Sequence, residues 1–445
     1  MNSILIFGAG KSATYLIEYL GSVSDENGWK LLVCDGNIEL AQSKIAGSNT
    51  AKAISIDVSN NEQRKSLVQK ADIIISMLPP NLHFLVAQDC LDYSKHLLTA
   101  SYIDDNIKSL EEKIKNKNLL FLCEMGLDPG IDHMSAMKLI HKIRKEGGVI
   151  TSFKSHCGGL VAPENDDNPW HYKITWNPGN IVMAGSSGAV YLNQGQIVRL
   201  LYKEVFDKCT EVNFPGLSSL AWYPNRDSLS YIKNYGLNDV DTFIRTTLRF
   251  PSFCRGWNKI VNMGFTALDD LDVIRNCKTY ADWFNIKLDS VANNDQNNIL
   301  LFTGKNLYDE EFSQQLDYLE LRSDKAIESE FTSSASLLQH QLETKLSIKH
   351  HEKDMIAMLH EITYNLHGEN KSIISSLIVK GHDQIHTAMA KTVGLPLGIA
   401  AKLMMQNKIK LTGLHIPILP EIYEPVLFEL KSHSIKFNEE TLFSK

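Results

Sequence analysis

The chain has 445 residues, a formal net charge of −7 and a pI near 6.1, and 43% of its residues are hydrophobic. Such a balance excludes a disordered or fibrous protein, and an acidic chain does not suit nucleic acid or an acidic membrane surface as a partner. A chain of this length exceeds one simple core, so we expect two or three domains.

Strand and helix patterns alternate from the first residues to about residue 125. Short apolar runs predict strands at residues 4–7, 29–34, 53–58, 71–78, 97–102 and 119–122. The continuous apolar run at 71–78 is typical of a central parallel strand. This alternation predicts an N-terminal Rossmann domain, which is a doubly wound parallel sheet.

The first predicted strand runs directly into the segment GAGKSA at residues 8–13, and a helix pattern follows. In this GxGxxG/A motif, Gly8 makes the tight turn, Gly10 lets a pyrophosphate approach the backbone, and Ala13 allows close packing of helix and strand. A strand before the motif and a helix after it are the context that supports a dinucleotide site.

Asp35 ends the second predicted strand, where a carboxylate accepts hydrogen bonds from the adenosine ribose and repels a 2′-phosphate. No Lys or Arg follows within six residues to neutralise it. The alternative is a turn aspartate before Gly36. We therefore predict NAD rather than NADP as the cofactor.

The pattern changes after the first domain. A predicted helix at about 132–145 leads into shorter strands up to about residue 250, and amphipathic helix patterns dominate about 258–350. Strand patterns return at Met355, and residues 388–406 predict a long helix. These features indicate a mixed α+β domain with a helical insertion.

Cellular location is predicted from cysteine usage and from the absence of targeting signals. The seven cysteines are scattered without a CxxC pair, as in a reducing cytoplasm. We find no apolar run of the roughly 18 residues that cross a bilayer, and the start of the chain lacks the basic start and the small-residue cleavage site of a signal peptide. We expect a cytoplasmic protein without a membrane partner.

Several longer motifs occur in order along the chain. The segment at 124–133 contains GLDPGIDH, and CGGLVAPE at 157–164, YPNRDS at 223–228 and RTTLR at 245–249 follow. Together they resemble the saccharopine dehydrogenases of the L-glutamate-forming kind, also called saccharopine reductases. The resemblance covers nearly the whole chain and is weakest at about 258–350.

This resemblance implies oxidation of saccharopine to L-glutamate and 2-aminoadipate 6-semialdehyde, or the reverse reaction. Fungal members that work in biosynthesis use NADP and carry an arginine at the end of the second strand, where this chain has Asp35. The departure favours NAD and the direction of lysine degradation. The resemblance also implies a homodimer through the sheet of the second domain.

The expected domains follow from pattern and resemblance together. Residues 1–127 form the Rossmann domain, and 385–445 pack back on it. Residues 128–257 and 351–384 form the α+β domain that binds substrate and dimerises, and 258–350 form the helical insertion.

Saccharopine carries three carboxylates, so its site needs fixed positive charge. Arg226 and Arg249 can grip carboxylates through paired hydrogen bonds, unless each merely pairs with a local acid such as Asp227. We expect substrate contacts from these two and from further residues in the motifs or at a strand's carboxyl end: Ser101, Tyr102, Asp128 and Thr247.

Candidates for proton transfer are Asp128, Cys157 and Tyr102. Asp128 can equally cap the following helix, and a lone cysteine such as Cys157 is more often a small core residue. His133 at the start of that helix can simply cap or pack. The choice among the three candidates stays open.

The residues expected to bind the cofactor lie in the phosphate loop, at the carboxyl ends of strands and in the second domain. They are Gly8, Gly10, Lys11, Ser12, Ala13, Asp35, Asp57, Val58, Leu78, Ser101, Leu127 and Trp176. No metal is expected, because His350, His351 and His360 lack the HExxH spacing and suit a solvated face better.

Two other functions remain open at this point. One is a carboxynorspermidine dehydrogenase, which reduces a related imine and has fewer carboxylates to hold. The other is a scaffold that binds NAD without turnover.

Overall fold

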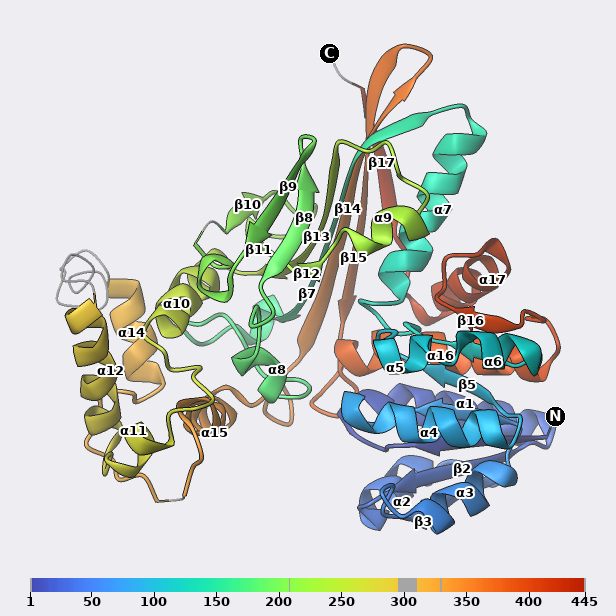
Figure 1. Cartoon of the computed structure of the whole chain (residues 1–445), viewed down its shortest axis with the longest axis horizontal. Helices are drawn as coiled ribbons and strands as arrows, with labels where there is room; N and C mark the ends of the chain where they lie inside the picture. The colour runs from blue at the N-terminus through green and yellow to red at the C-terminus, as the bar shows by residue number, and fades with distance from the viewer. Residues whose placement is uncertain (1, 208, 295–309, 329, 444–445) are drawn as a thin grey trace. The chain divides into compact units, whose positions relative to one another are not determined.

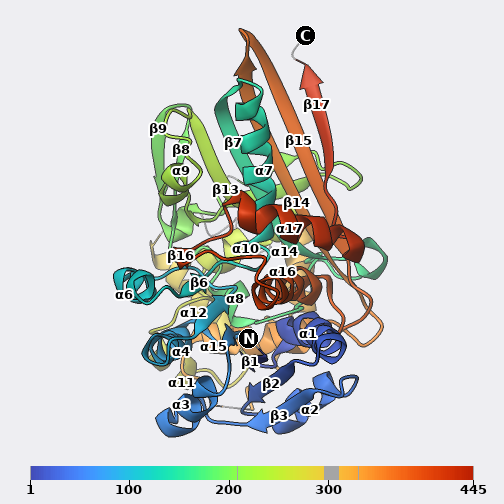
Figure 2. The ribbon, with the colours of Figure 1, turned by 90° about the vertical axis from the view of Figure 1, so that its right-hand side faces the viewer.

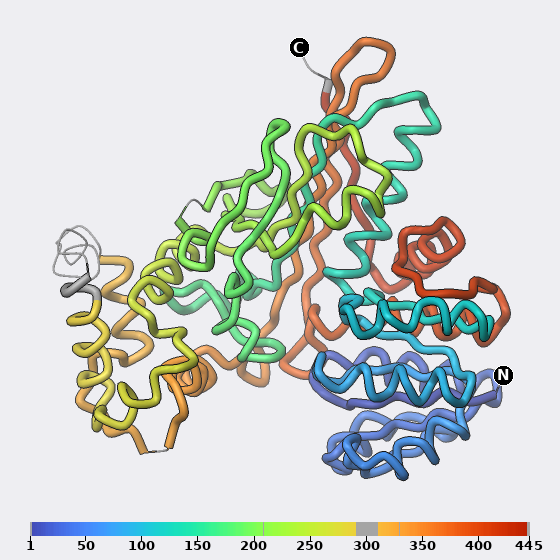
Figure 3. The backbone as a smooth tube through the Cα atoms, viewed as in Figure 1, coloured from blue at the N-terminus to red at the C-terminus, as the bar shows by residue number. Residues whose placement is uncertain are grey.

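The computed structural model describes residues 2–207, 209–294, 310–328 and 330–443, and Figure 3 traces the backbone. The chain divides into two compact units. Unit 1 comprises Met1–Val149, Asn365–Glu369 and Leu377–Glu439, and unit 2 comprises Ile150–Tyr364, Asn370–Ser376 and Glu440–Lys445.

Unit 1 contains a seven-stranded sheet in the order β16-β6-β5-β4-β1-β2-β3, with every adjacent pair parallel. Its strands are β1 (Ser3–Phe7), β2 (Lys30–Asp35), β3 (Ala51–Ser55), β4 (Ile73–Ser76), β5 (His96–Thr99), β6 (Leu120–Leu122) and β16 (Gly413–His415). Six of them have the Rossmann order, which confirms the predicted doubly wound sheet. The seventh, β16, is contributed by the C-terminal part of the chain.

Several strand boundaries differ from the sequence predictions, and at the ends of β3 and β5 side chains turn the backbone. The third strand was expected at 53–58, but Asp57 accepts both the N–H and the hydroxyl of Ser59, and this turn follows the end of β3. The fifth was expected at 97–102, but the Ser101 N–H turns back to the Thr99 hydroxyl. Both corrections place polar residues just beyond a strand's carboxyl end.

Helices cover both faces of this sheet, as Figures 1 and 2 show. They are α1 (Thr14–Asn27), α2 (Ile38–Ile45), α3 (Asn61–Gln69), α4 (Pro80–Asp92), α5 (Asp105–Lys108), α6 (Glu111–Asn116) and α16 (Ala388–Met405). Two further helices of unit 1, α7 (Ile131–Lys145) and α17 (Pro420–Leu430), pack against each other. Helix α16 packs closely on α1: a Cβ on Gly394 would lie 2.8 Å from the Leu16 nitrogen, and one on Gly398 would lie 2.7 Å from the Tyr19 ring. The two glycines therefore set the distance between these helices.

Helix α16 is long and apolar enough to meet the length and composition criteria for crossing a membrane. From the sequence, no such run was expected. In this structure 78% of that segment is buried inside the protein. Its packing on α1 gives a physical reason for its apolar composition.

The second sheet is mixed and has ten strands, most of whose residues belong to unit 2. The path runs β10-β11-β13-β7-β14-β15-β17, and β8, β9 and β12 pair off this path. The strands are β7 (Val149–Val161), β8 (Ala189–Asn193), β9 (Gln196–Leu200), β10 (Thr210–Val212), β11 (Leu220–Pro224), β12 (Arg226–Asp227), β13 (Thr242–Arg249), β14 (Asp354–Leu366), β15 (Glu369–Lys380) and β17 (Asn438–Phe443). A mixed sheet confirms the expected α+β architecture.

Unit 2 also contains several helices. They are α8 (Gly179–Val182), α9 (Ser230–Asn234), α10 (Pro251–Asn262), α11 (Leu271–Arg275), α12 (Tyr280–Asn294), α14 (Glu310–Tyr318) and α15 (Ser334–Leu346). The core of this region is aromatic: Trp170, Trp257 and Trp283 are fully buried, and the Phe253 and Trp257 rings stack at 5.4 Å. Part of the expected helical stretch, residues 295–309, lies outside the described residues.

Candidate functional site

The phosphate loop lies between β1 and α1 in unit 1. Gly8 has a φ of +98°, and a Cβ there would meet the Met77 carbonyl oxygen at 2.8 Å. A Cβ on Gly10 would have no described protein atom within 4 Å, so packing inside the chain does not require a glycine there. A glycine at this position leaves the backbone bare, so that a ligand can approach it closely. The loop therefore fits a pyrophosphate.

Asp35 holds the same loop through its carboxylate. One oxygen accepts the Ala9 N–H at 2.7 Å and the other accepts the Asn37 N–H at 2.8 Å. Lys44 donates from Nζ to the Gly10 carbonyl at 2.5 Å, and burial lowers the pKa of Lys44 to about 8, against the opposing effect of Asp35. The search for a neutralising Lys or Arg within six residues after Asp35 missed Lys44, because helix α2 brings this residue back toward the loop.

The remaining predicted cofactor residues of unit 1 lie beyond the carboxyl ends of strands. Asp57 and Val58 follow β3, Leu78 follows β4, and Leu127 lies in the loop before α7. A buried arginine fixes part of this edge: Arg64 donates to the Val58 carbonyl and pairs with Asp89, both at 2.6 Å. Sequence reasoning did not single out Arg64.

The GLDPGIDH loop presents Asp128 as a half-buried residue among buried neighbours. Gly130 is the residue that caps α7, and no side chain serves as the cap, so Asp128 does not have the N-cap role that we had weighed for it. Asp132 instead accepts the Gly130 N–H at 2.6 Å. Gly130 has a φ of +146°, and a Cβ there would lie 2.0 Å from the Gly126 carbonyl oxygen, so only glycine fits.

His133 lies buried beneath the same loop. Its Nε2 is 2.7 Å from a carboxylate oxygen of the buried Glu124. The other Glu124 oxygen accepts the Ile103 N–H at 3.3 Å, and the Glu124 N–H donates to the Ser101 carbonyl at 3.0 Å. Glu124 and His133 thus hold the segment of Ser101 and Tyr102 in place. His133 packs in the interior, which was one of the two roles expected for it.

Ser101 and Tyr102 follow β5, and both side chains are half-buried. The Ser101 hydroxyl is 2.6 Å from Nε2 of His83, a residue of α4 that sequence reasoning missed. The segment LPPNLH carried no signal for it, because a single histidine inside a helix pattern is usually a core residue.

In unit 2, neighbouring strands bring Cys157, Thr247 and Tyr223 side by side. Cys157 of β7 is in register with Thr247 of β13, which is in register with Tyr223 of β11. Cys157 lies within the 13-residue strand β7. Thr247 also hydrogen bonds to Tyr223, and burial raises the pKa of Tyr223 to about 12.

Arg249 lies two residues further along β13 and is only 8% exposed. Its Nη1 donates to the carbonyls of Leu248 at 2.8 Å and Gly159 at 3.3 Å. Its guanidinium carbon lies 5.2 Å from the centre of the Tyr172 ring. Among the described residues Nε has no hydrogen-bond acceptor, and the groups that act on the charge of Arg249 are phenols and thiols. The free Nε and Nη2 edge suits a carboxylate.

Arg226 occupies a different environment. It is exposed, has a φ of +50°, and lies in the two-residue strand β12, which pairs with β8. The structure therefore places the two predicted substrate arginines on separate strands, one exposed and one buried.

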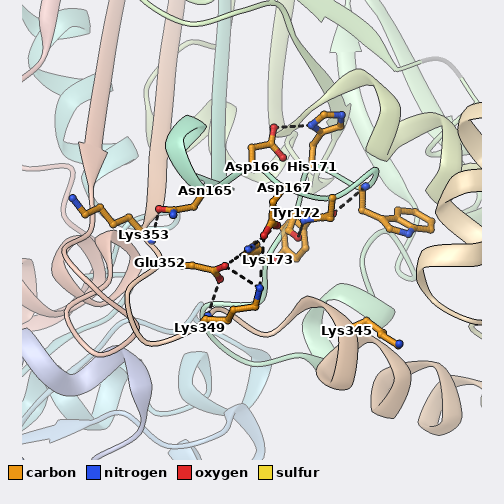
Figure 4. Close-up of polar contacts among 12 residues, drawn as sticks. Asn165, Asp166, Asp167, His171, Tyr172, Lys173, Lys345, Lys349, Glu352 and Lys353 are labelled. Atoms are coloured by element: carbon orange, nitrogen blue, oxygen red, sulfur yellow. Dashed lines mark hydrogen bonds and ion pairs between the residues drawn. The ribbon is translucent and has the colours of Figure 1, made fainter.

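A cluster of charges fixes the chain around Tyr172, as Figure 4 shows. Lys173, only 4% exposed, contacts Glu352 at 2.5 Å and Asp167 at 2.8 Å, and Lys349 lies 3.5 Å from Glu352. Lys173 is thus held in an ion-pair cluster with two carboxylates.

Trp176 is half-buried and hydrogen bonds to the Tyr172 side chain. Burial raises the pKa of Tyr172, so its phenol is neutral at pH 7. Trp176 therefore supports the ring that lies against Arg249. Its expected contact with the cofactor stays a prediction.

Metal binding was not expected, and no group of three or more potential ligands occurs in the described part of the chain. One detail of that reasoning is wrong. His360 does not lie on a solvated face; it is buried, and its ring stacks on Phe153 at 6.1 Å, because β14 carries it into the interior.

Comparisons with known proteins agree on one family. Residues 4–122 match the model described as "Saccharopine dehydrogenase NADP binding domain", and residues 126–435 match "Saccharopine dehydrogenase C-terminal domain". The chain is 30% identical to a protein of Saccharomyces cerevisiae named saccharopine dehydrogenase [NADP(+), L-glutamate-forming], over 99% of both chains.

A longer relative and a solved structure are also similar to this chain. The chain is 31% identical to an Arabidopsis thaliana alpha-aminoadipic semialdehyde synthase over 98% of its own length, but spans only 45% of that protein. It therefore covers about half the length of this and similar curated relatives. The structure of the apo L-glutamate-forming saccharopine dehydrogenase of S. cerevisiae superimposes with a TM-score of 0.88 at 28% identity, covering 99% of this chain and all of that one.

Proposed function

Because this chain belongs to the saccharopine dehydrogenase family, we propose that it oxidises saccharopine to L-glutamate and 2-aminoadipate 6-semialdehyde with NAD, in lysine metabolism. The balanced reaction consumes one saccharopine, one NAD⁺ and one water. It yields glutamate, the semialdehyde, NADH and one proton. We further propose the degradative direction.

The observation that carries this proposal is the buried, unneutralised charge of Arg249. A buried charge without a partner is costly, and proteins normally pair it with a carboxylate. Here the neighbouring groups are the neutral phenols of Tyr172 and Tyr223, while one edge of the guanidinium lacks a protein partner among the described residues. A substrate carboxylate would supply the missing anion.

Residues of unit 1 would hold the cofactor. The loop at 8–13 would bind the pyrophosphate through backbone N–H groups at the start of α1, and Asp35 would accept hydrogen bonds from the ribose. A nicotinamide dinucleotide, when bound, supplies the acceptor for a hydride. The chain itself must bind and orient the substrate, admit one water and move protons.

Asp128, Tyr102 and Cys157 are the proposed residues for proton transfer, with the assignment among them open. Loss of the hydride-bearing C–H bond converts the secondary amine to an imine. Water adds to that imine, and the resulting carbinolamine loses the amine to give the aldehyde. Each stage needs a proton given or taken near the substrate nitrogen or the attacking water. The half-buried carboxylate of Asp128 and the half-buried Tyr102 lie in unit 1, and Cys157 lies in unit 2 beside Thr247.

The choice of NAD rests on Asp35, since a carboxylate at that position repels a 2′-phosphate. The full-length fungal relatives are named as NADP enzymes. Lys44 partly offsets the charge of Asp35, and its ammonium already contacts the Gly10 carbonyl. We therefore propose a preference for NAD, not an exclusive use of it.

A spectrophotometric assay tests substrate and cofactor together. Purified protein is mixed with saccharopine and either NAD⁺ or NADP⁺, and absorbance at the reduced nicotinamide band is followed. We expect turnover with saccharopine and a higher kcat/KM with NAD⁺. Turnover only with carboxynorspermidine, or cofactor binding without turnover, would contradict the proposed reaction. A tenfold preference for NADP⁺, worth about 1.4 kcal/mol, would contradict the role given to Asp35.

A further inference from the structure

His83 lies between two serine hydroxyls at the carboxyl edge of the parallel sheet. Its Nδ1 is 2.7 Å from the Ser76 hydroxyl oxygen, and its Nε2 is 2.6 Å from the Ser101 hydroxyl oxygen. Ser76 ends β4, Ser101 follows β5, and His83 projects from the first turn of α4. The imidazole thus bridges the ends of two adjacent strands within unit 1.

The ring is neutral at physiological pH. His83 is 5% exposed, and burial lowers its pKa to about 4, against the opposing effect of Asp104. A neutral imidazole carries one hydrogen, so one ring nitrogen donates and the other accepts. The two hydroxyl partners must therefore have opposite roles.

The burial of Ser76 decides between the two tautomers. Its side chain is 1% exposed, and among the described residues His83 is the only hydrogen-bond partner of its hydroxyl. If Nδ1 carried the hydrogen, the hydroxyl hydrogen of Ser76 would be buried without an acceptor, which is unfavourable. The favoured arrangement has the Ser76 O–H donating to Nδ1 and the Nε2–H donating to the Ser101 oxygen.

We propose that His83 is a positioning residue that makes the Ser101 hydroxyl a hydrogen-bond donor to the bound ligand. Because the Ser101 oxygen accepts from Nε2–H, its own hydrogen points away from the imidazole. Ser101 is half-buried, so that hydrogen remains available to a ligand atom. The partner is an acceptor oxygen, either of a substrate carboxylate or of the nicotinamide carboxamide. The inference rests on the proposed function, since it requires a ligand at this edge.

The tautomer can be read without any substrate. Protein labelled with ¹⁵N-histidine is examined by long-range ¹H–¹⁵N NMR between pH 6 and 8, and His83→Gln identifies the resonances. We expect hydrogen on Nε2 throughout this range. Hydrogen on Nδ1, or a charged ring at pH 6, would overturn the inference even if saccharopine is the substrate. The expected tautomer would support it even if another substrate is found.

Kinetics then test the link from His83 to Ser101. His83→Phe and Ser101→Ala should each lower kcat/KM about 3- to 10-fold, the effect of one neutral hydrogen bond. The double variant should lose no more than either single one, because both changes remove the same contact. His83→Gln can donate an N–H to Ser101 and should recover most of the activity. Additive losses, or no recovery with glutamine, would overturn the proposal.

A fluorescence titration with NADH separates the two possible ligand oxygens. A weaker affinity of Ser101→Ala for NADH identifies the carboxamide, and an unchanged affinity with a higher KM for saccharopine identifies the carboxylate. The proposal would be overturned if both the affinity for NADH and the KM for saccharopine stayed unchanged. His141→Phe is the matched control, because His141 also bonds a hydroxyl, that of Tyr423 at 2.8 Å, outside the site. Its kinetics should stay at the wild-type level.

Discussion

Replacing Arg249 by lysine keeps the positive charge but removes the planar fork. In the structure Nη1 is engaged by two backbone carbonyls, which leaves the Nε and Nη2 edge for a carboxylate. An ammonium cannot donate two parallel hydrogen bonds from one edge. A hydrogen bond to a charged group contributes about 1.5–3 kcal/mol, so Arg249→Lys should lower kcat/KM for saccharopine about 10- to 150-fold.

Steady-state kinetics with saccharopine at fixed saturating NAD⁺ measures this loss, and the KM for NAD⁺ should be unchanged. Arg255→Lys is the matched control: Arg255 is exposed and pairs with Glu311 at 2.9 Å, so its replacement should leave the kinetics intact. A second readout needs no turnover. Saccharopine at about 100 times its Kd should stabilise the wild type by about 2.7 kcal/mol and Arg249→Met far less.

The reasoning fails if Arg249→Lys keeps kcat/KM within about twofold of the wild type while remaining folded, since no paired contact would then have been lost. It also fails if saccharopine stabilises Arg249→Met as much as the wild type, because binding would then not depend on this charge.

Three further predictions follow from particular contacts. Asp35→Arg with Gly36→Ser should shift preference toward NADP, but with weaker binding of both cofactors, because the Ala9 N–H loses its acceptor; cofactor titrations check both effects. Lys173→Met should lower the free energy of unfolding in urea by about 3 kcal/mol, since it leaves Glu352 buried beside only the exposed Lys349. Adding Glu352→Leu should restore much of that stability. The hydrogen bond to Asp166 raises the pKa of His171, so this pair stabilises the fold at low pH and less as pH rises through that pKa. The wild type should therefore be slightly more stable at pH 6 than at pH 8 in thermal unfolding through this pair, and His171→Gln should remove that difference.

The sequence by itself determined the fold class and the phosphate loop, because both depend on local information. Apolar runs that alternate with helix spacing specify a parallel sheet, and the pattern at 8–13 needs only its own glycines and the flanking elements. Strand ends were less well determined, since side-chain contacts such as Asp57 with Ser59 and Ser101 with Thr99 turn the backbone.

Tertiary structure alone decided what each candidate side chain contacts. Arg226 and Arg249 come from similar motif segments, yet one is exposed and the other is buried against Tyr172, because they lie on different strands. Helices also bring three side chains, those of Lys44, Arg64 and His83, into contact with residues that follow the strands of the parallel sheet. Hydrogen bonds and desolvation depend on neighbours distant in sequence, and no local pattern encodes them.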